Sequence, residues 1–479
     1  MISFDNSYAR LPERFYTRID PARVAAPKLL RLNAPLARQL GLDPEWLASP
    51  DGVAMLAGAA MPEGAASLAL VYAGHQFGHF SPQLGDGRAL LVGEFEAPDG
   101  QRYDLHLKGS GRTPYSRGGD GRAAVGPVLR EYVVSEAMAA LGVPTSRTLA
   151  AVATGERVFR ERILPGAVLA RVAKSHIRVG TFEYFAARGD GEGVKALADY
   201  AIQRHDPAAA EAAQPYRAFL DGVVARTADL IARWMAVGFI HGVMNTDNMS
   251  IAGETIDYGP CAFMDDYHPA TVFSSIDHQG RYAYANQPRI AHWNMARLAQ
   301  ALAPLLGERE DAAVASAQAA IDAFAGLFED AYLARMRAKI GLETAMPDDA
   351  SLIDGLLAAM ANRKADFTST FRHLAEHLDE GPVPDGLDAW VARWRERLAA
   401  EGRSSADMRA RMDAVNPLYI PRNHLVEEAL AAAENDGDLE PLDRLLGAVK
   451  APFAPQANAA RYAAPPLPHE IVEATFCGT

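Results

Sequence analysis

Cysteine is scarce in this chain of 479 residues, which contains only Cys261 and Cys477. Two cysteines cannot build a disulfide framework, and so few are typical of a reducing compartment. No run approaches the roughly 18 consecutive apolar residues of a membrane-spanning helix. The first residues, MISFDNSYARLPERF, carry early charges and no apolar core, unlike a secretory signal. We therefore expect a soluble, cytoplasmic protein that does not bind a membrane.

A surplus of basic residues is also missing. The 47 Lys and Arg residues face 60 Asp and Glu residues, which gives a net charge of −13. Nucleic-acid binders normally carry a basic surplus, so we expect no nucleic-acid partner. Basic clusters in an acidic chain are local, and such clusters often hold an anionic ligand. A hydrophobic fraction of 49% allows a large core, and the length allows roughly two to four domains.

Short apolar runs between glycines predict β-strands in the first part of the chain. Strands are expected at Ala89–Glu96 and Tyr103–Lys108, because PDG at Pro98–Gly100 between them is a strong hairpin signal. Two further strands are predicted in TLAAVATGERVF and GAVLARVA. The stretch MSIAGETIDYG predicts two more short strands around Gly253.

Helical spacing of apolar residues dominates the rest of the chain. One helix is predicted in VLREYVVSEAMAALG, with Gly142 as its stop signal. A longer helix is predicted in AFLDGVVARTADLIARWMAVGF. Its apolar face is formed by Leu220, Val223, Val224, Ile231, Trp234 and Met235. From Trp293 onward the chain is mostly alanine-rich helix, and the proline-rich stretch Ala451–Pro468 predicts an irregular strap.

The stretch HGVMNTDNMS, His241–Ser250, has the spacing of a protein-kinase catalytic loop but lacks the catalytic aspartate. Kinases have His-Arg-Asp, four residues and then Asn, and His241 and Asn248 keep that spacing. Val243 stands where the aspartate belongs, and Asp247 is the only carboxylate in the loop. The stretch therefore indicates either an inactive kinase or a site arranged for another reaction.

Neighbouring elements supply further parts of a nucleotide site. Lys108 ends a predicted strand and Glu131 lies early in the following helix, the order in which kinases pair a lysine with a glutamate. Asn248 and the Asp257 of DYG carry hard oxygen atoms, which suit Mg²⁺. Taken alone, Lys108 and Glu131 are better explained as a surface lysine and a solvated helix charge, and Asp-x-Gly is common in turns, but the order of these residues along the chain favours a functional site.

Arginines accompany the glycine-rich loops. Guanidinium groups match phosphate oxygens in a bidentate manner, and the backbone N–H groups of a glycine loop can cradle phosphates. For the arginines of the loop Gly109–Gly126, plain surface charge stays open as the alternative. The candidates are Arg88, Arg112, Arg117, Arg122, Arg171 and Arg178.

HQFGH places His75 and His79 four residues apart. On a helix the two histidines would share a face and could bind a metal, but the intervening glycine disfavours a helix, so a structural role is favoured. Cys261 is expected to be a small buried side chain. Cys477 is the third residue from the end of the sequence. Both a redox role and the absence of any role stay open for this residue.

Several long blocks together identify a family. They are YAGHQFGHFSPQLGDGRA, DLHLKGSGRTPYSRGGDGRAAVGPVLREY, RVAKSHIRVGTFEYF, HGVMNTDNMSI, TIDYGPCAFMDDY, DHQGRYAYANQP and NPLYIPRNHLVEEAL. These blocks resemble the selenoprotein O family, known in bacteria as YdiU, and the resemblance runs from about Asn6 to the C-terminus.

The resemblance implies an α+β, protein-kinase-like bilobal fold, with a β-rich N-lobe, a mostly helical C-lobe and an extension at each end. The corresponding divisions are residues 1–67, 68–215, 216–450 and 451–479. The implied reaction is adenylyl transfer: AMP moves from ATP, bound in a flipped orientation, to a Ser, Thr or Tyr hydroxyl of a target protein. The resemblance further implies Mg²⁺, with Mn²⁺ as the alternative. A bacterial cytoplasmic location is expected from the composition, and a monomer is expected while the oligomeric state stays open.

The same resemblance assigns roles to individual residues. Asp247 matches the general base, Asn248 and Asp257 match the metal ligands, and Glu131 matches the partner of the lysine at the nucleotide site. The positions that match nucleotide contacts are Gly85, Gly87, Arg88, Lys108, Asp120, Gly121, Arg171 and Arg178, with Asp257 beside them.

The C-terminus departs from the family pattern. Many members end in a Cys-x-x-Sec or Cys-x-x-Cys motif, but here only Gly478 and Thr479 follow Cys477. That local bond is therefore excluded for this sequence, while a long-range bond to Cys261 stays open.

Three other functions stay open on the sequence alone. They are transfer of the γ-phosphate with Asp247 as a displaced base, nucleotide binding without catalysis, and Mn²⁺-dependent transfer of UMP. Val243 favours the binding role, whereas the intact Lys, Glu, Asn and Asp set argues against it. The sequence names no target protein.

Overall fold

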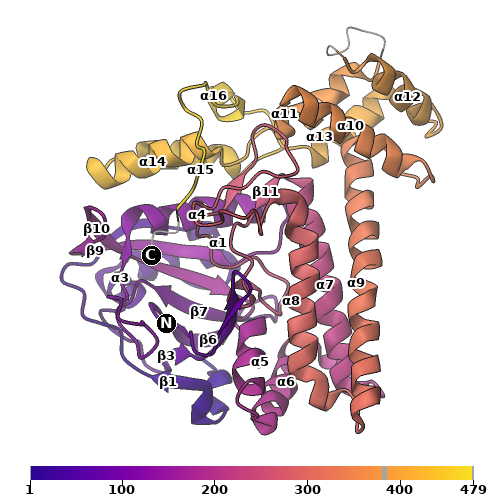
Figure 1. Ribbon diagram of the computed structural model, residues 1–479. Coiled ribbons are helices and arrows are strands. Elements are labelled where there is room, and N and C mark those ends of the chain that lie inside the picture. Colours follow the sequence, from indigo (N-terminus) through magenta and orange to yellow (C-terminus); the bar gives the residue numbers. More distant parts are fainter. Residues whose placement is uncertain (1, 380–385, 477–479) are drawn as a thin grey trace.

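The computed structural model describes residues 2–379 and 386–476, and in this part of the chain an eight-stranded antiparallel sheet fills the left half of Figure 1. The strand order is β1-β3-β6-β7-β10-β9-β2, and β8 pairs with β10 off this path. The strands span Tyr16–Arg18 (β1), Lys28–Leu32 (β2), Leu68–Leu70 (β3), Ala89–Glu96 (β6), Arg102–Lys108 (β7), Ala123–Ala124 (β8), Arg147–Phe159 (β9) and Ile163–Ala173 (β10). Two small hairpins pair Gly74–Gln76 (β4) with His79–Ser81 (β5) and Phe239–Ile240 (β11) with Ala262–Phe263 (β12).

The predicted strands of the main sheet are confirmed. Ala89–Glu96 is β6, and β7 begins at Arg102, one residue earlier than predicted. In the turn between them Gly100 has a φ of +74°, a left-handed conformation that glycine adopts without steric cost. TLAAVATGERVF and GAVLARVA lie within β9 and β10.

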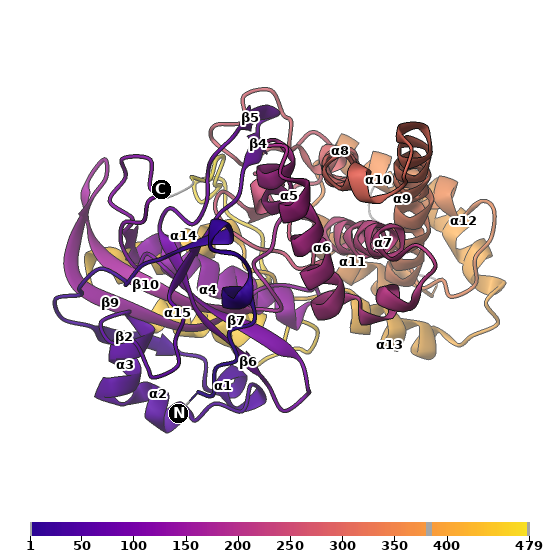
Figure 2. The same ribbon diagram turned by 90° about the horizontal axis from the view of Figure 1, so that it is seen from below.

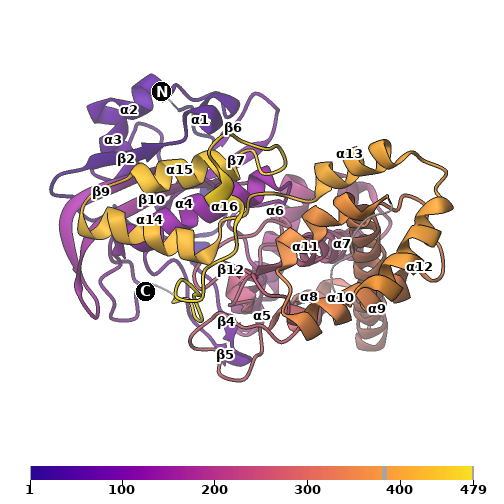
Figure 3. The same cartoon turned by 90° about the horizontal axis from the view of Figure 1, so that it is seen from above.

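Both faces of the sheet are covered by helices. Because successive strand residues point to opposite faces, Val152 and Val168 pack with α1–α3 in one apolar core, whereas Ala151 and Leu169 pack with α4, α14 and α15 in another. Figure 3 shows α4, α14 and α15 together over the sheet. These helices span Ala34–Gln39 (α1), Pro44–Ala48 (α2), Pro50–Leu56 (α3), Val125–Ala140 (α4), Asn423–Asn435 (α14) and Glu440–Val449 (α15).

Helices form the other side of the molecule, to the right in Figures 1 and 2. The predicted long helix is confirmed as α7, Pro215–Ala236, and every residue of its predicted apolar face is buried. It packs along α9, Glu310–Lys339. The remaining helices span Val179–Ala186 (α5), Gly191–His205 (α6), Gln287–Leu302 (α8), Asp349–Arg363 (α10), Phe367–His373 (α11), Asp388–Ala399 (α12), Ser405–Val415 (α13) and Ala460–Ala463 (α16).

The two short strands predicted around Gly253, a segment that the structure describes in full, do not form. An isolated bridge joins Met249 to Thr255 instead. The backbone of Thr255 is engaged elsewhere: its N–H donates to the carbonyl of Pro144 at 2.9 Å, and its carbonyl accepts from the N–H of Ser146 at 2.9 Å. Because a strand ladder would need these same groups, the segment pairs with the turn after α4 rather than with itself.

The segments at both ends of the chain join the same framework. Strands β1 and β2, which precede Leu68, form the two edges of the sheet. The predicted strap Ala451–Pro468 contains the short helix α16 and is otherwise irregular. The division of the chain at residues 67, 215 and 450 stays a prediction. Within the described ranges, no helix has both the length and the apolar character needed to cross a bilayer.

Lys339, the last residue of α9, is buried among aromatic rings. Its Nζ lies 4.4 Å from the ring centroid of Phe371 and 5.5 Å from that of Phe367. Burial lowers the pKa of Lys339 from 10.5 to about 7. Below pH 7 the lysine is charged in the folded and the unfolded chain, so the folded state bears the full cost of burying the charge. Between pH 7 and 10.5 the lysine is neutral only in the folded chain, and this cost fades as the pH rises.

The variant Lys339→Met is therefore expected to be more stable than the native chain, by on the order of 3 kcal/mol near pH 6 and by little near pH 10. Thermal unfolding at several pH values measures the difference in Tm. Lys28→Met, at the exposed start of β2, is the matched control and should leave Tm unchanged. A gain in Tm that does not shrink as the pH rises would contradict the charge explanation.

Candidate functional site

A cavity of about 760 Å³ lies where the glycine-rich turns of the sheet meet the loop His241–Ser250. A cavity of this volume is typical of a site for a nucleotide-sized ligand. Most of the predicted site residues line it: Gly85, Gly87, Arg88, Lys108, Asp120, Gly121, Arg171, Arg178, Asp247, Asn248 and Asp257. Glu131 lines an adjoining cavity of about 210 Å³, which Lys108 and Arg88 also reach. The structure thus brings these residues to one place, while their chemical roles stay predictions.

Lys108, at the end of β7, forms an ion pair with Glu131 of α4, with 2.6 Å between Nζ and Oε2. Arg171 of β10 donates to the other carboxylate oxygen at 2.9 Å. Pairing of β7 with β10 places Arg171 opposite His106, two residues before Lys108 and therefore on the same face of the sheet. Burial opposes the charge on Glu131, but Lys108 and Arg171 outweigh it and hold the pKa of this carboxyl below its ordinary value.

Asp257 of the DYG turn is surrounded by three cations. Lys108 and Arg171 donate to its Oδ1 at 3.1 and 2.8 Å, and Arg178 donates to its Oδ2. Burial alone would raise the pKa of Asp257, but Arg178, Arg171 and Lys108 hold it well below its ordinary value. The backbone φ of Asp257 is +59°, a left-handed conformation that costs a non-glycine residue about 1 kcal/mol. Such strain persists where surrounding contacts impose the conformation, which is common at functional sites.

Asp247 lies in the single 3₁₀ turn Thr246–Asn248 and is 7% exposed. The Nε2 of Gln76 donates to its Oδ2 at 3.3 Å, and Arg178 donates to its backbone carbonyl at 2.5 Å. The Oδ1 atom is buried and, among the described residues, has no hydrogen-bond partner. Burial raises the pKa of Asp247 to about 6, although the positive charge of Arg178 opposes this rise. The carboxyl is therefore mostly ionised at neutral pH.

Asn248 and Asp257 present oxygen atoms that suit a hard divalent cation. The amide nitrogen of Asn248 donates to the carbonyl of Val243 at 2.9 Å. The amide oxygen is therefore the atom of this side chain that could bind a cation. In the described ranges no three His, Cys, Asp or Glu side chains come together to enclose an ion. A Mg²⁺ or Mn²⁺ ion held by Asn248 and Asp257 would therefore take its other ligands from water and from the phosphates of a nucleotide, as Mg²⁺ commonly does.

Two glycines line the cavity where no side chain would fit. Gly85 has a φ of +98°, and a Cβ atom there would lie 2.6 Å from the ring of Tyr115. Gly121 has a φ of +69°, and a Cβ atom there would lie 2.1 Å from the carbonyl oxygen of Gly111. Turns of this kind direct backbone N–H groups together, which suits phosphate oxygens.

The loop arginines do not all reach the cavity. Arg117 and Arg122 belong to its lining, whereas Arg112 is outside the described lining and donates to the carbonyl of Gly118. The sequence did not single out Arg160, which lines the cavity from the turn between β9 and β10 and pairs with Asp120 at 2.8 Å. No local motif marks Arg160. It reaches the cavity because the long strands β9 and β10 carry the turn between them to the cavity.

HQFGH forms a hairpin, and its first histidine has the structural role that the sequence favoured. The Nδ1 of His75 in β4 pairs with Glu183 of α5 at 2.6 Å. Cys261 is fully buried, which confirms the expectation from the sequence. Cys477 lies outside the described residues, so its redox role and its bond to Cys261 stay untested.

The cavity and the comparison with known families together indicate the class of protein. Glycine turns, three cations around Asp257 and a separate acid in Asp247 form a polar cavity large enough for a nucleotide. Residues 1–450 match the family described as protein adenylyltransferase SelO. The chain belongs to this family and is an enzyme of the nucleotidyltransferase class.

Curated relatives extend over the whole chain. A protein from Rhodopseudomonas palustris (strain BisB5), named protein nucleotidyltransferase YdiU, is 62% identical to this chain over 99% of both sequences. Proteins of the same name from Methylorubrum populi and Bradyrhizobium diazoefficiens are each 58% identical and cover at least 99% of both sequences. The similarity therefore extends over nearly the whole length of the chain.

Proposed function

We propose that the enzyme transfers AMP from ATP to Ser, Thr or Tyr hydroxyls of target proteins, on a bilobal framework of the protein-kinase type. The observation that carries the proposal is the placement of charge around one cavity. Lys108, Arg171 and Arg178 gather at Asp257, while Val243 occupies the position of the kinase base and Asp247 lies on the cavity wall. This arrangement suits a triphosphate held by its terminal phosphates, with the acid near the α-phosphate.

The cations are suited to bind and then stabilise the leaving pyrophosphate. ATP carries about four negative charges, and its phosphates offer Lys108, Arg171 and Arg178 partners equivalent to the carboxylates that they now contact. With the γ-phosphate beside Lys108, the α-phosphate faces Asp247. Asn248 and Asp257 would hold a Mg²⁺ or Mn²⁺ ion, which supplies positive charge that orients and polarises the phosphates. Cations fixed in this way stabilise charge that develops on the departing group.

Asp247 is proposed to orient the acceptor hydroxyl. The hydroxyl oxygen forms a bond to the α-phosphorus, the bond from that phosphorus to the bridging oxygen of the β-phosphate breaks, and pyrophosphate leaves. The hydroxyl proton passes to the carboxylate of Asp247. A carboxyl with a pKa of about 6 is a weak base toward an alcohol, so holding the hydroxyl in line contributes more than proton abstraction.

Isotope placement tests the proposal directly. The enzyme is incubated with casein, an unfolded acceptor rich in serine, and with ATP labelled at the α- or the γ-phosphate in parallel samples with Mg²⁺. We expect protein-bound label from α-labelled ATP alone. Label from γ-labelled ATP alone would indicate a kinase with a displaced base, and label from neither would indicate a nucleotide-binding scaffold.

The choice of nucleotide needs a separate comparison. Samples with α-labelled UTP and Mn²⁺ are run beside samples with α-labelled ATP and Mg²⁺ or Mn²⁺. ATP is expected to be the better donor under both metals. A rate of UMP transfer that exceeds AMP transfer by about tenfold or more would replace ATP with UTP as the physiological donor.

A further inference from the structure

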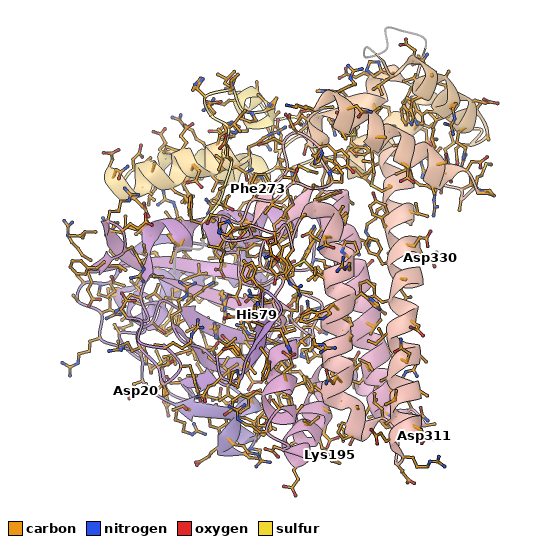
Figure 4. The ribbon with its side chains drawn as sticks, in the orientation of Figure 1. Asp20, His79, Lys195, Phe273, Asp311 and Asp330 are labelled. Atoms are coloured by element: carbon orange, nitrogen blue, oxygen red, sulfur yellow. The ribbon has the colours of Figure 1, made fainter. Side chains whose placement is uncertain are left out.

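The β4–β5 hairpin contacts three consecutive residues of the loop that carries Asp247. The N–H of His75 donates to Oγ1 of Thr246 at 2.7 Å, and the N–H of Phe77 donates to Oδ1 of Asn245 at 2.9 Å. Between these two anchors, the side chain of Gln76 donates to Asp247. Figure 4 labels His79, which starts β5 and marks this hairpin near the middle of the view.

Side chains fix the hairpin to the rest of the molecule. Oε1 of Glu183 in α5 pairs with His75, and its Oε2 accepts a hydrogen bond from Thr246. Phe77 packs edge-on against the ring of Tyr282, with 5.1 Å between centroids, and the Tyr282 hydroxyl donates to the same Asn245 oxygen. Because both residues that flank Gln76 are held in this way, its amide is directed at Asp247 with little freedom.

A glycine beside Asp247 makes the close approach of the hairpin feasible. A Cβ atom at Gly74 would lie 2.4 Å from Oδ1 of Asp247. The hairpin therefore shields Oδ1, which is buried without a hydrogen-bond partner in the described structure. This leaves Oδ2, the oxygen to which Gln76 donates, for an incoming hydroxyl. Among the described residues, Gln76 is the only one whose side chain donates to this carboxylate.

We propose that Gln76 is a positioning residue for nucleotidyl transfer: its amide holds the Asp247 carboxylate in the orientation from which Oδ2 meets the acceptor hydroxyl. The inference rests on the role proposed for Asp247 and extends it to a residue that acts through Asp247. Arg178 donates to the backbone carbonyl of Asp247 and, in the described structure, leaves the carboxylate to Gln76. Orientation of a catalytic group within about 1 Å can change a rate by about 100-fold, so one hydrogen bond can matter.

Gln76→Met tests the proposal, because methionine keeps the length of glutamine and removes the donor. We expect kcat for AMP transfer to casein to fall about tenfold, with KM and Kd for ATP unchanged, because only the orientation of Asp247 is lost. Gln203→Met, on an exposed position of α6, is the matched control and should keep native kcat. Thermal unfolding and ATP binding of each variant show that the fold and the nucleotide site persist.

A double variant separates positioning from other roles. In the Asp247→Asn background, Gln76→Met should lower kcat by less than about twofold, because the group that Gln76 positions is already disabled. A full tenfold further loss, or a rise in KM for ATP with unchanged kcat, would overturn the proposal, as would native kcat for Gln76→Met. Different results would overturn the proposed function itself: the native enzyme would transfer no label from α-labelled ATP, or Asp247→Asn would retain full activity.

Discussion

Asp257→Ala is expected to lower the rate of nucleotidyl transfer by about 1000-fold or more. The carboxylate of Asp257 accepts hydrogen bonds from Lys108, Arg171 and Arg178 and is the proposed partner of Asn248 in holding a metal ion. Its removal takes away the group that fixes the three cations relative to one another and to the ion. Label transfer from α-labelled ATP measures the loss.

ATP binding without metal should survive in Asp257→Ala, because its phosphates can replace the carboxylate as partners of the cations. Isothermal titration of ATP in the presence of a chelator measures this retained affinity. Asp266→Ala, at an exposed position nine residues later, is the matched control and should keep native activity. Full activity of Asp257→Ala would remove this residue from the metal site, and loss of metal-free ATP binding would show that the variant has lost the cavity rather than one ligand.

Asp247→Asn is expected to lower kcat by about 100-fold while KM for ATP changes little. The substitution keeps the size of the side chain and removes the charge that orients the acceptor hydroxyl and takes its proton. Since the side chain of Asp247 contacts Gln76 and its backbone contacts Arg178, the hydrogen bonds that hold the loop are largely retained. Steady-state rates with α-labelled ATP and casein separate kcat from KM.

The matched control for Asp247→Asn is Asp322→Asn, at an exposed position of α9. It removes one negative charge from a residue outside the described lining of the cavity and should leave both constants unchanged. A large rise in KM for ATP with unchanged kcat would contradict the proposed role and assign Asp247 to nucleotide binding. Retention of native kcat would indicate that binding and metal chemistry suffice without this acid.

Much of the fold was predictable because strand and helix signals are local. The boundaries of β6 and the buried face of α7 follow from apolar spacing and turn residues within a few positions. The strands predicted around Gly253 failed for the opposite reason. Their local pattern is that of a hairpin, but the backbone of Thr255 is engaged by Pro144 and Ser146, more than 100 residues earlier in the chain.

The charged residues of the candidate site were predictable from the sequence. Lys108 and Glu131 were paired from the order of strand and helix, and the structure has them 2.6 Å apart. Asp247 and Asp257 were chosen from the loop pattern and line the same cavity. Arg160 escaped notice because it lies in no motif, and Gln76 escaped notice because attention in HQFGH went to the spacing of its two histidines. Arg112, which the glycine loop suggested, lies outside the described lining.

By itself, therefore, the sequence determined the main strands, the long helix and the residue types available for phosphate and metal chemistry, because periodicity, turn propensity and charge are properties of short segments. Only the tertiary structure decided which atoms meet. Gln76 donates a hydrogen bond to Asp247, which lies 171 positions later in the chain. Lys108, Arg171 and Arg178 all donate to the carboxylate of Asp257. Hydrogen bonds and ion pairs depend on tenths of an ångström between elements distant in the chain, and packing of the sheet against the helices sets those distances.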